Sequence, residues 1–172
     1  SAAATSPDPI GHLLGFPVTR GFGVITPGLE RFGPHTGIDL GMATGTPIYA
    51  IGDGVVVVDD DDGRYDPGEP TTWSGISVQY RLADDGAQVT VAHLNRNTVE
   101  SGNQVAAGQI IGYCGSTGAS TGPHTHLEVR DIAGLFMDPI PYLEARHMTP
   151  DQLRAILDKI EDAADSSLIW HE

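Results

Sequence analysis

The sequence predicts a mainly β fold, an antiparallel β-sheet core followed by one C-terminal amphipathic helix. Short apolar runs with period-two alternation fill residues 14–142, and turn residues interrupt them, with 22 Gly and 12 Pro in the 172-residue chain. No helical pattern separates these runs, and strands that follow one another without crossover helices pair antiparallel. A capped apolar stripe after residue 149 predicts the helix.

At least six strands can be placed. TPIYAIGDGVVVV, residues 46–58, predicts two strands around a hairpin turn at Asp53-Gly54. ISVQYRL, residues 76–82, alternates, which turns its apolar residues inward and Ser77 outward. QVTVAHL then puts His93 on the face of Val89 and Val91, and QIIGY and HLEVR complete the set.

The helix over residues 149–164 has a clear start signal. Thr149 and Gln152 form a capping-box pattern, and Pro150 occupies the first helical position. The apolar residues then fall at i, i+3, i+4 and i+7, as Leu153, Ile156, Leu157 and Ile160. We expect this stripe to pack on the domain, and a contact with a partner or a second subunit is the alternative.

The chain divides by pattern into an N-terminal arm (1–13), one domain (14–145) and a C-terminal helical extension (146–172). No run reaches the roughly 18 apolar residues of a membrane span, so we expect no membrane insertion. The balance of 9 Lys+Arg against 23 Asp+Glu argues against nucleic acid as a partner. The lone Cys114 excludes an internal disulfide, and its apolar surroundings indicate a small buried residue rather than a catalytic thiol.

Two segments carry histidines in patterns that suit a metal. His35 and Asp39 are four residues apart, but the glycines around them disfavour a helix. In a straight strand the pair would be about 13 Å apart, so sharing an ion requires a bend, which Gly37 would permit. His124 and His126 alternate in an extended segment and should face one side. Metal binding, proton transfer and exposed surface all remain open for this pair.

The other histidines are less informative. His93 ends an alternating strand, where a single histidine is usually partly buried and hydrogen-bonded. The remaining three are expected at the surface, namely His12, His147 and His171.

Several other sites are disfavoured. There is no His-Glu-x-x-His helix of a zincin. GASTG matches Gly-x-Ser-x-Gly at Ser120, but Pro123 and a strand follow where a nucleophile elbow needs a helix, and no Lys-Ser/Thr follows as in a phosphate loop. Residues 58–69 match several positions of a calcium loop, yet Val58 stands at its first ligand position, which favours a solvated acidic loop.

Taken together, the segments resemble the lysostaphin/LytM-type zinc endopeptidases, which cut peptide bonds in bacterial peptidoglycan. HTGIDLGMATGTPIYAIGDGVVV is similar to the family's His-x-Gly-x-Asp segment. VAAGQIIGYCGSTGASTGPHTHLEV is similar to its second signature, and MDPIPYL to its closing Asp-Pro stretch. The match covers roughly residues 14–143, so the resemblance implies that residues 14–145 are a catalytic domain whose sheet carries a groove with a zinc site.

The resemblance implies that His35, Asp39 and His126 hold one Zn²⁺ per chain. His93 and His124 would serve the chemistry as unligated catalytic groups, orienting a water, accepting its proton and stabilising the oxyanion. The metal would lower the pKa of that water to roughly 7.

Three further positions bear on this resemblance. Glu128 shares the predicted face of His126 and is either a hydrogen-bonding partner of that ligand or an ordinary strand residue. Thr125 stands where the family usually has an apolar residue, and Val91 where it often has Tyr.

Two other functions compete with a peptidase. Glucose-specific phosphotransferase IIA domains are also β-rich and show a His-x-Gly-x-Asp segment, which makes a histidine phosphocarrier one alternative. A scaffold that binds the cell wall without cleaving it is the other. The peptidase hypothesis implies a peptidoglycan peptide as substrate and a place outside the cell, in the cell wall or periplasm, or on a phage virion. The bond cleaved, the biological source and the oligomeric state stay open.

Overall fold

The computed structural model describes residues 8–28, 33–60 and 73–167. In these ranges the strands are β1 (Val18–Arg20), β2 (Ile38–Leu40), β3 (Pro47–Tyr49), β4 (Gly54–Asp60), β5 (Ile76–Leu82), β6 (Gln88–Asn97), β7 (Gln104–Val105), β8 (Ile110–Cys114), β9 (Thr125–Arg130) and β10 (Phe136–Met137). The helices are α1 (Pro9–Leu14), α2 (Pro139–His147) and α3 (Pro150–Ser167).

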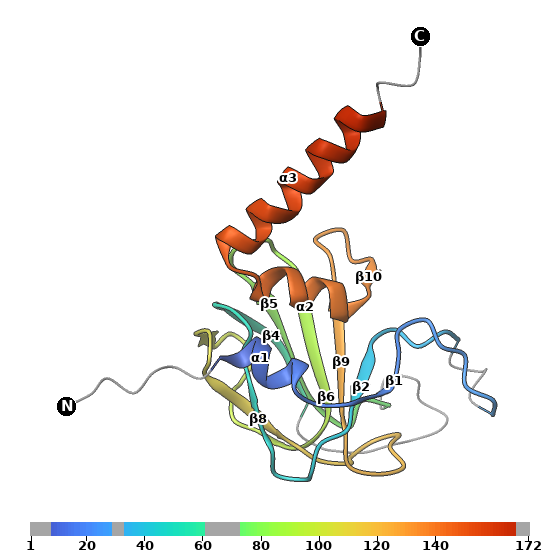
Figure 1. Ribbon diagram of the computed structural model, residues 1–172. Helices are drawn as coiled ribbons and strands as arrows, with labels where there is room; N and C mark the ends of the chain where they lie inside the picture. Colours follow the sequence, from blue (N-terminus) through green and yellow to red (C-terminus); the bar gives the residue numbers. More distant parts are fainter. Residues whose placement is uncertain (1–7, 29–32, 61–72, 168–172) are drawn as a thin grey trace.

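All strand pairs are antiparallel, which confirms the predicted mainly β fold. The main path runs β1-β2-β9-β6-β5-β4-β7, with β10 on β9 and β8 on both β3 and β6. Strands β6 and β9 lie at the centre of the sheet (Figure 1). The strand order therefore places β2 and β6, which are far apart in the sequence, on either side of β9.

The register gives the sheet one core face and one polar face at this point. Leu127 of β9 lies between Ile38 of β2 and Val91 of β6, and all three are almost completely buried. One residue earlier on β9, His126 lies between Asp39 and Ala92. Because successive side chains alternate between faces, the Leu127 row fills the core and the His126 row faces the other way.

The predicted hairpin at Asp53-Gly54 is wrong. β3 pairs with β8, while β4 pairs with β5 and β7, so the segment between β3 and β4 joins two different pairings. Gly54 is paired on both sides within the sheet, and a Cβ on it would lie 2.3 Å from the Arg81 carbonyl oxygen. Gly54 is therefore needed for close strand approach, not for a turn.

The alternation predicted for β5 is largely confirmed. Val78, Tyr80 and Leu82 are buried in the core. Ser77 is also buried, at 6% exposure, whereas Gln79 is half-buried and Arg81 is exposed on the same face. The predicted outward position of Ser77 corresponds to the polar face, which is not solvated there.

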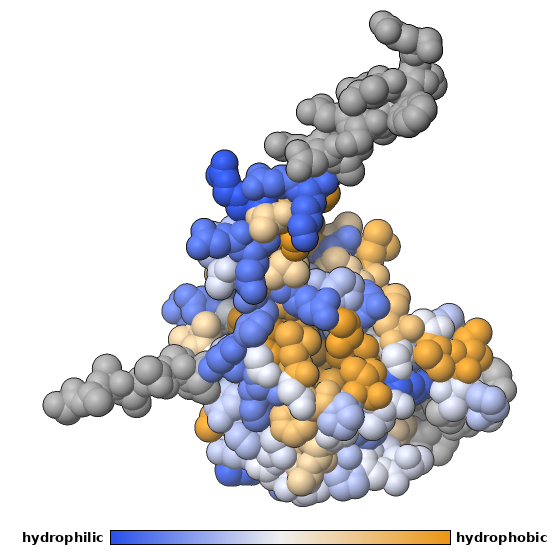
Figure 2. Space-filling model, viewed as in Figure 1, coloured by the Kyte–Doolittle hydropathy of each residue, from blue (hydrophilic) through white to orange (hydrophobic). Residues whose placement is uncertain are grey.

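The last residues of the predicted N-terminal arm form a helix that was not predicted from the sequence. Residues 9–14 form α1, capped by the Asp8 side chain, which accepts a hydrogen bond from the Gly11 amide. Ile10 and Leu13 of this helix are buried in the core, and α2 contributes Leu143 to the same core. An apolar area covers the surface near α1 and α2 (Figure 2). Residues 1–7 lie outside the described ranges, and the division into arm, domain and extension stays a prediction.

Helix α3 begins as predicted but does not pack as predicted. The Thr149 amide donates to Gln152 Oε1 at 2.8 Å, and the Gln152 amide donates to Thr149 Oγ1 at 3.3 Å, which completes the capping box. The helix projects away from the sheet (Figure 1). Its apolar stripe is exposed at 41–60%, at Leu153, Ile156, Leu157 and Ile160. None of the helices in the described ranges has the length and apolar content that a membrane crossing needs.

Cys114 and the acidic loop are the subjects of two further expectations. Cys114 is fully buried, as predicted. Most of the loop at residues 58–69 lies outside the described ranges, as does His171.

Candidate metal centre

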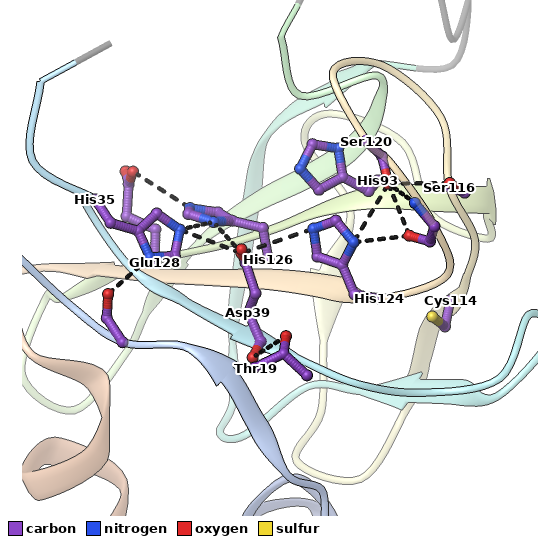
Figure 3. Close-up of polar contacts among 12 residues, drawn as sticks. Thr19, His35, Asp39, His93, Cys114, Ser116, Ser120, His124, His126 and Glu128 are labelled. Carbon is purple, nitrogen blue, oxygen red and sulfur yellow. Dashed lines mark hydrogen bonds and ion pairs between the residues drawn. The ribbon is translucent and has the colours of Figure 1, made fainter. Parts of the chain in front are cut away.

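Three ligand atoms converge on the polar face of β2 and β9. Asp39 and His126 are direct partners in the β2–β9 register, and Nδ1 of His126 lies 3.0 Å from Oδ1 of Asp39. Nε2 of His35 lies 3.2 Å from the same oxygen and 3.0 Å from Nδ1 of His126. The three residues predicted to hold zinc are thus brought together, and all three are buried (Figure 3).

His35 reaches this point because the chain bends just before β2. Thr36 and Gly37 form the bend, so the pair His35 and Asp39 is not extended as in a straight strand. Gly37 is required for space here: a Cβ on it would lie 2.2 Å from the Leu127 carbonyl oxygen and 2.9 Å from Nε2 of His126. The predicted bend is confirmed, and the glycine also allows β2 to approach the second histidine ligand.

The atoms that meet here fit a metal ion. Nδ1 of His35 lies 2.9 Å from the Gly21 carbonyl oxygen, which can only accept, so this nitrogen donates and Nε2 carries the lone pair of the neutral ring. Electron-pair donors this close repel one another unless a proton or a cation lies between them. Ligands of tetrahedral Zn²⁺, at bonds of about 2.0 Å, are about 3.3 Å apart. The observed separations of 3.0–3.2 Å match that spacing.

The electrostatics of the centre favour a cation. Burial of Asp39 raises its pKa, but the hydrogen bonds and charges of His126 and His35 outweigh burial and hold the pKa well below its ordinary value. Burial lowers the pKa of His126, but Asp39 and Glu128 outweigh it and raise the pKa. The carboxylate is therefore ionised, and the positive charge it attracts comes from a proton or from a metal ion.

His124 lies at the edge of this centre. Its Nε2 is 3.7 Å from Oδ1 of Asp39, and its Nδ1 is 2.8 Å from the Gly122 carbonyl oxygen, to which it donates. Two residues before His126, it faces the same side, as the alternation predicts. Ser120 lies 3.3 Å from Nδ1 of His124. Ser120 lies in a loop that leads into β9, not into a helix, so the nucleophile elbow is excluded.

His93 reaches the centre through a β-bulge, not through regular alternation. Between the pairs Val78–Val91 and Ile76–Leu94, β6 has one residue more than β5. His93 lies at this bulge with φ 61°, the left-handed region that non-glycine residues seldom adopt. The predicted shared face of His93 and Val91 is wrong, since Val91 is in the core while the His93 ring lies 4.7 Å from the His124 ring.

The protonation state of His93 follows from its surroundings. Burial, followed by the repulsion of His124, lowers the pKa of His93 to about 4. Its Nδ1 donates to the Thr117 carbonyl oxygen at 2.9 Å, which leaves a lone pair on Nε2. His93 is accordingly neutral at pH 7 and able to accept a proton.

Trp73 is a neighbour of the centre that no sequence pattern indicated. Its ring centroid lies 5.0 Å from that of His126 and 5.8 Å from that of His93, both edge to face. The Trp73 carbonyl accepts a hydrogen bond from the Ala119 amide, which ties the segment before β5 to the loop before β9. Such a tertiary contact leaves no local signal in the sequence.

The other described histidines lie away from the centre. His147 is exposed, as expected, and its Nε2 lies 2.7 Å from Oδ2 of Asp8. His12 is partly buried instead of solvated: its ring packs edge to face against Phe16 and Tyr49.

Comparison with known proteins agrees with this geometry. The profile of peptidase family M23 matches residues 33–139. This range includes both segments that contribute to the metal centre, the one with His35 and Asp39 and the one with His126. DD-carboxypeptidase/endopeptidase Mpg of Neisseria meningitidis is 40% identical over 114 residues, covering 66% of this chain and 24% of the relative. Glycyl-glycine endopeptidase ALE-1 of Staphylococcus capitis is 35% identical over 117 residues, covering 66% of this chain and 30% of the relative.

A solved structure shares the fold. The catalytic domain of the antimicrobial peptidase lysostaphin from Staphylococcus simulans superposes with a TM-score of 0.66 at 31% identity, covering 78% of this chain and 97% of that domain. The chain spans only about a quarter to a third of the length of the two curated relatives.

Proposed function

The chain belongs to peptidase family M23, and on that basis we propose that it is a zinc-dependent endopeptidase that hydrolyses peptide bonds of bacterial peptidoglycan. The observation that carries the proposal is the convergence of His35 Nε2, Asp39 Oδ1 and His126 Nδ1 within 3.2 Å of one another. Family membership decides against the histidine phosphocarrier. The substrate implies a place outside the cytoplasm, in the cell wall, the periplasm or a phage particle.

His35, Asp39 and His126 would hold Zn²⁺ through two nitrogens and one oxygen, a ligand set that suits this metal. Zn²⁺ at such a site supplies a water whose pKa is lowered to about 7 and polarises the scissile carbonyl. Three protein ligands leave a fourth position open for that chemistry. Burial of the three side chains keeps the local dielectric low, which strengthens each electrostatic interaction.

His93 and His124 would act as the acid–base groups. The carbonyl oxygens of Thr117 and Gly122 hold Nδ1 of each ring as the donor, so Nε2 is the free atom. A neutral His93 accepts the proton of the attacking water and then, as an imidazolium, donates it to the leaving amine. His124, whose Nε2 lies 3.7 Å from Oδ1 of Asp39, would donate to the oxyanion in its imidazolium form, in which both ring nitrogens carry protons.

The experiment is digestion of purified peptidoglycan by the zinc-loaded protein, with mass spectrometry of the products. The names of Mpg and ALE-1 suggest two substrates to compare, DD cross-linked muropeptides and glycyl-glycine bridges. We expect one class to release fragments with new amino and carboxyl ends, and His126→Ala to release less than a hundredth as much. Absence of cleavage in both classes by a protein that holds one zinc would favour the non-catalytic scaffold.

A further inference from the structure

Glu128 is a buried carboxylate beside the metal centre. It follows His126 by two residues on β9, faces the same side of the sheet and is only 3% exposed. Its Oε2 lies 3.9 Å from Nε2 of His126. Within the described part of the chain, that buried Nε2 has no hydrogen-bond partner, and the Glu128 carboxylate is the acidic group paired with it.

Two donors hold the carboxylate in this position. Thr36 Oγ1 donates to Oε2 at 2.7 Å, and Arg130 Nε donates to Oε1 at 2.9 Å. Arg130 is itself positioned, since its guanidinium lies 4.2 Å from the centre of the Phe136 ring on β10. Thr36 follows His35 directly in the chain. Glu128 therefore joins the segment that carries one histidine ligand to the strand that carries the other.

The chemistry of His126 requires a group of this kind. A histidine that offers Nδ1 to a metal must carry its proton on Nε2, and a carboxylate beside Nε2 favours that tautomer and makes Nδ1 a stronger donor. A buried carboxylate is costly unless it is paired, and Thr36 and Arg130 supply only part of its hydrogen bonds. We propose that Glu128 is a positioning residue that holds His126 in the metal-binding tautomer and ties its strand to His35.

This inference rests on the zinc site of the proposed function. Its test is therefore zinc affinity, measured by competition with a chromophoric chelator, together with the visible absorption of the Co²⁺-substituted protein. We expect Glu128→Leu to weaken zinc binding about a hundredfold and to change the Co²⁺ spectrum. Glu128→Gln is isosteric and keeps an acceptor oxygen facing Nε2 while losing the charge, so we expect a loss of about tenfold and a Co²⁺ spectrum close to that of the wild type.

Thr90→Val is the matched control, because Thr90 lies opposite Glu128 on the same face and is not among the groups that meet at His126. We expect it to bind zinc as the wild type does. Wild-type affinity in Glu128→Gln, or equal losses in Gln and Leu variants that are both folded, would overturn the proposal. If Glu128→Leu does not fold, the Gln variant alone decides. Retention of zinc by His126→Ala would instead remove the proposed metal site.

Discussion

Asp39 and His126 are direct partners across the β2–β9 register, and their ligand atoms lie 3.0 Å apart. Each is therefore positioned by the backbone pairing of two interior strands rather than by a loop. Sites on paired strands are held more precisely than sites on loops. The metal centre thus has two rigid ligands, with His35 added from the bend that precedes β2.

The charge of Asp39 can be tested without changing its size. In Asp39→Asn the oxygen is kept but the only carboxylate among the three ligands is lost, so we expect zinc affinity to fall more than a hundredfold, beyond the range of supporting residues. Metal analysis after gel filtration gives the zinc content of the variant, and competition with a chelator gives its zinc affinity. His147→Gln, at an exposed histidine, should bind one zinc per chain. Full zinc occupancy of Asp39→Asn would contradict the ligand assignment.

The left-handed backbone of His93 at the bulge should be strained for any residue other than glycine. A left-handed residue other than glycine costs about 1 kcal/mol, so we expect His93→Gly to be more stable than His93→Ala by about that amount. In a regular strand the order would be reversed, because glycine weakens a strand interior. Urea unfolding of the two variants gives the comparison. Greater stability of the Ala variant would mean that β6 is regular at this position.

His93 should also make stability depend on pH. Its pKa is about 4 in the folded protein and about 6.5 in an unfolded chain. Between these values the unfolded chain binds the proton more readily, so the free energy of unfolding falls as the pH is lowered from about 6.5 to about 4, by up to about 3 kcal/mol. Above pH 6.5 this contribution is fully present.

The measurement is thermal unfolding of the metal-free protein across this pH range. His93→Asn is the comparison, because Asn tolerates the left-handed backbone and does not titrate. We expect the difference between the two stability curves to change over the window from pH 6.5 to 4. Parallel curves would show that His93 has an ordinary pKa.

Gly37→Ala tests the close approach of β2 and β9. The added Cβ would lie 2.2 Å from the Leu127 carbonyl oxygen, so we expect a loss of about 1–3 kcal/mol of stability and weaker zinc binding through the displaced His126 ring. Gly122→Ala is the control, since a Cβ there meets open space and its φ is not positive. Equal stability of the two variants would indicate that the backbones of β2 and β9 are farther apart at Gly37 than the structure shows.

Truncation of a leucine in the exposed stripe of α3 should affect stability much less than truncation of a leucine in the core. Leu157 is 58% exposed, so Leu157→Ala should change domain stability by less than about 0.5 kcal/mol. Leu143 of α2 is fully buried, and Leu143→Ala should cost about 2–5 kcal/mol. Chemical denaturation measures both. A comparable cost at Leu157 would show that the stripe packs against the domain or against a second subunit.

Local patterns predicted those features that depend on neighbours in the sequence. Alternation identified the strands and the shared face of His124 and His126, and capping residues identified the start of α3. Helices α1 and α2 carry the same type of signal, an Asp cap followed by proline at Asp8-Pro9 and Asp138-Pro139, and could have been found.

The rest depends on contacts between distant segments. The bulge at His93 exists because β6 must pair with β5 and leave Leu94 in the core, and no residue type near it records that requirement. Trp73 and the pairing of β3 with β8 have the same origin. The exposed stripe of α3 shows the converse, because an amphipathic pattern indicates a buried face without indicating what buries it.

Three histidines of the centre are oriented by main-chain carbonyl groups, those of Gly21, Thr117 and Gly122. Every amino acid carries such a carbonyl, so the loops that contain these positions can exchange side chains while the imidazole rings keep their orientation. The orientation of these rings therefore depends on main-chain atoms, whereas the surface chemistry of the same loops depends on their side chains. Under the proposed function, substitutions in these loops would change the side chains offered to a substrate while the rings keep their orientation.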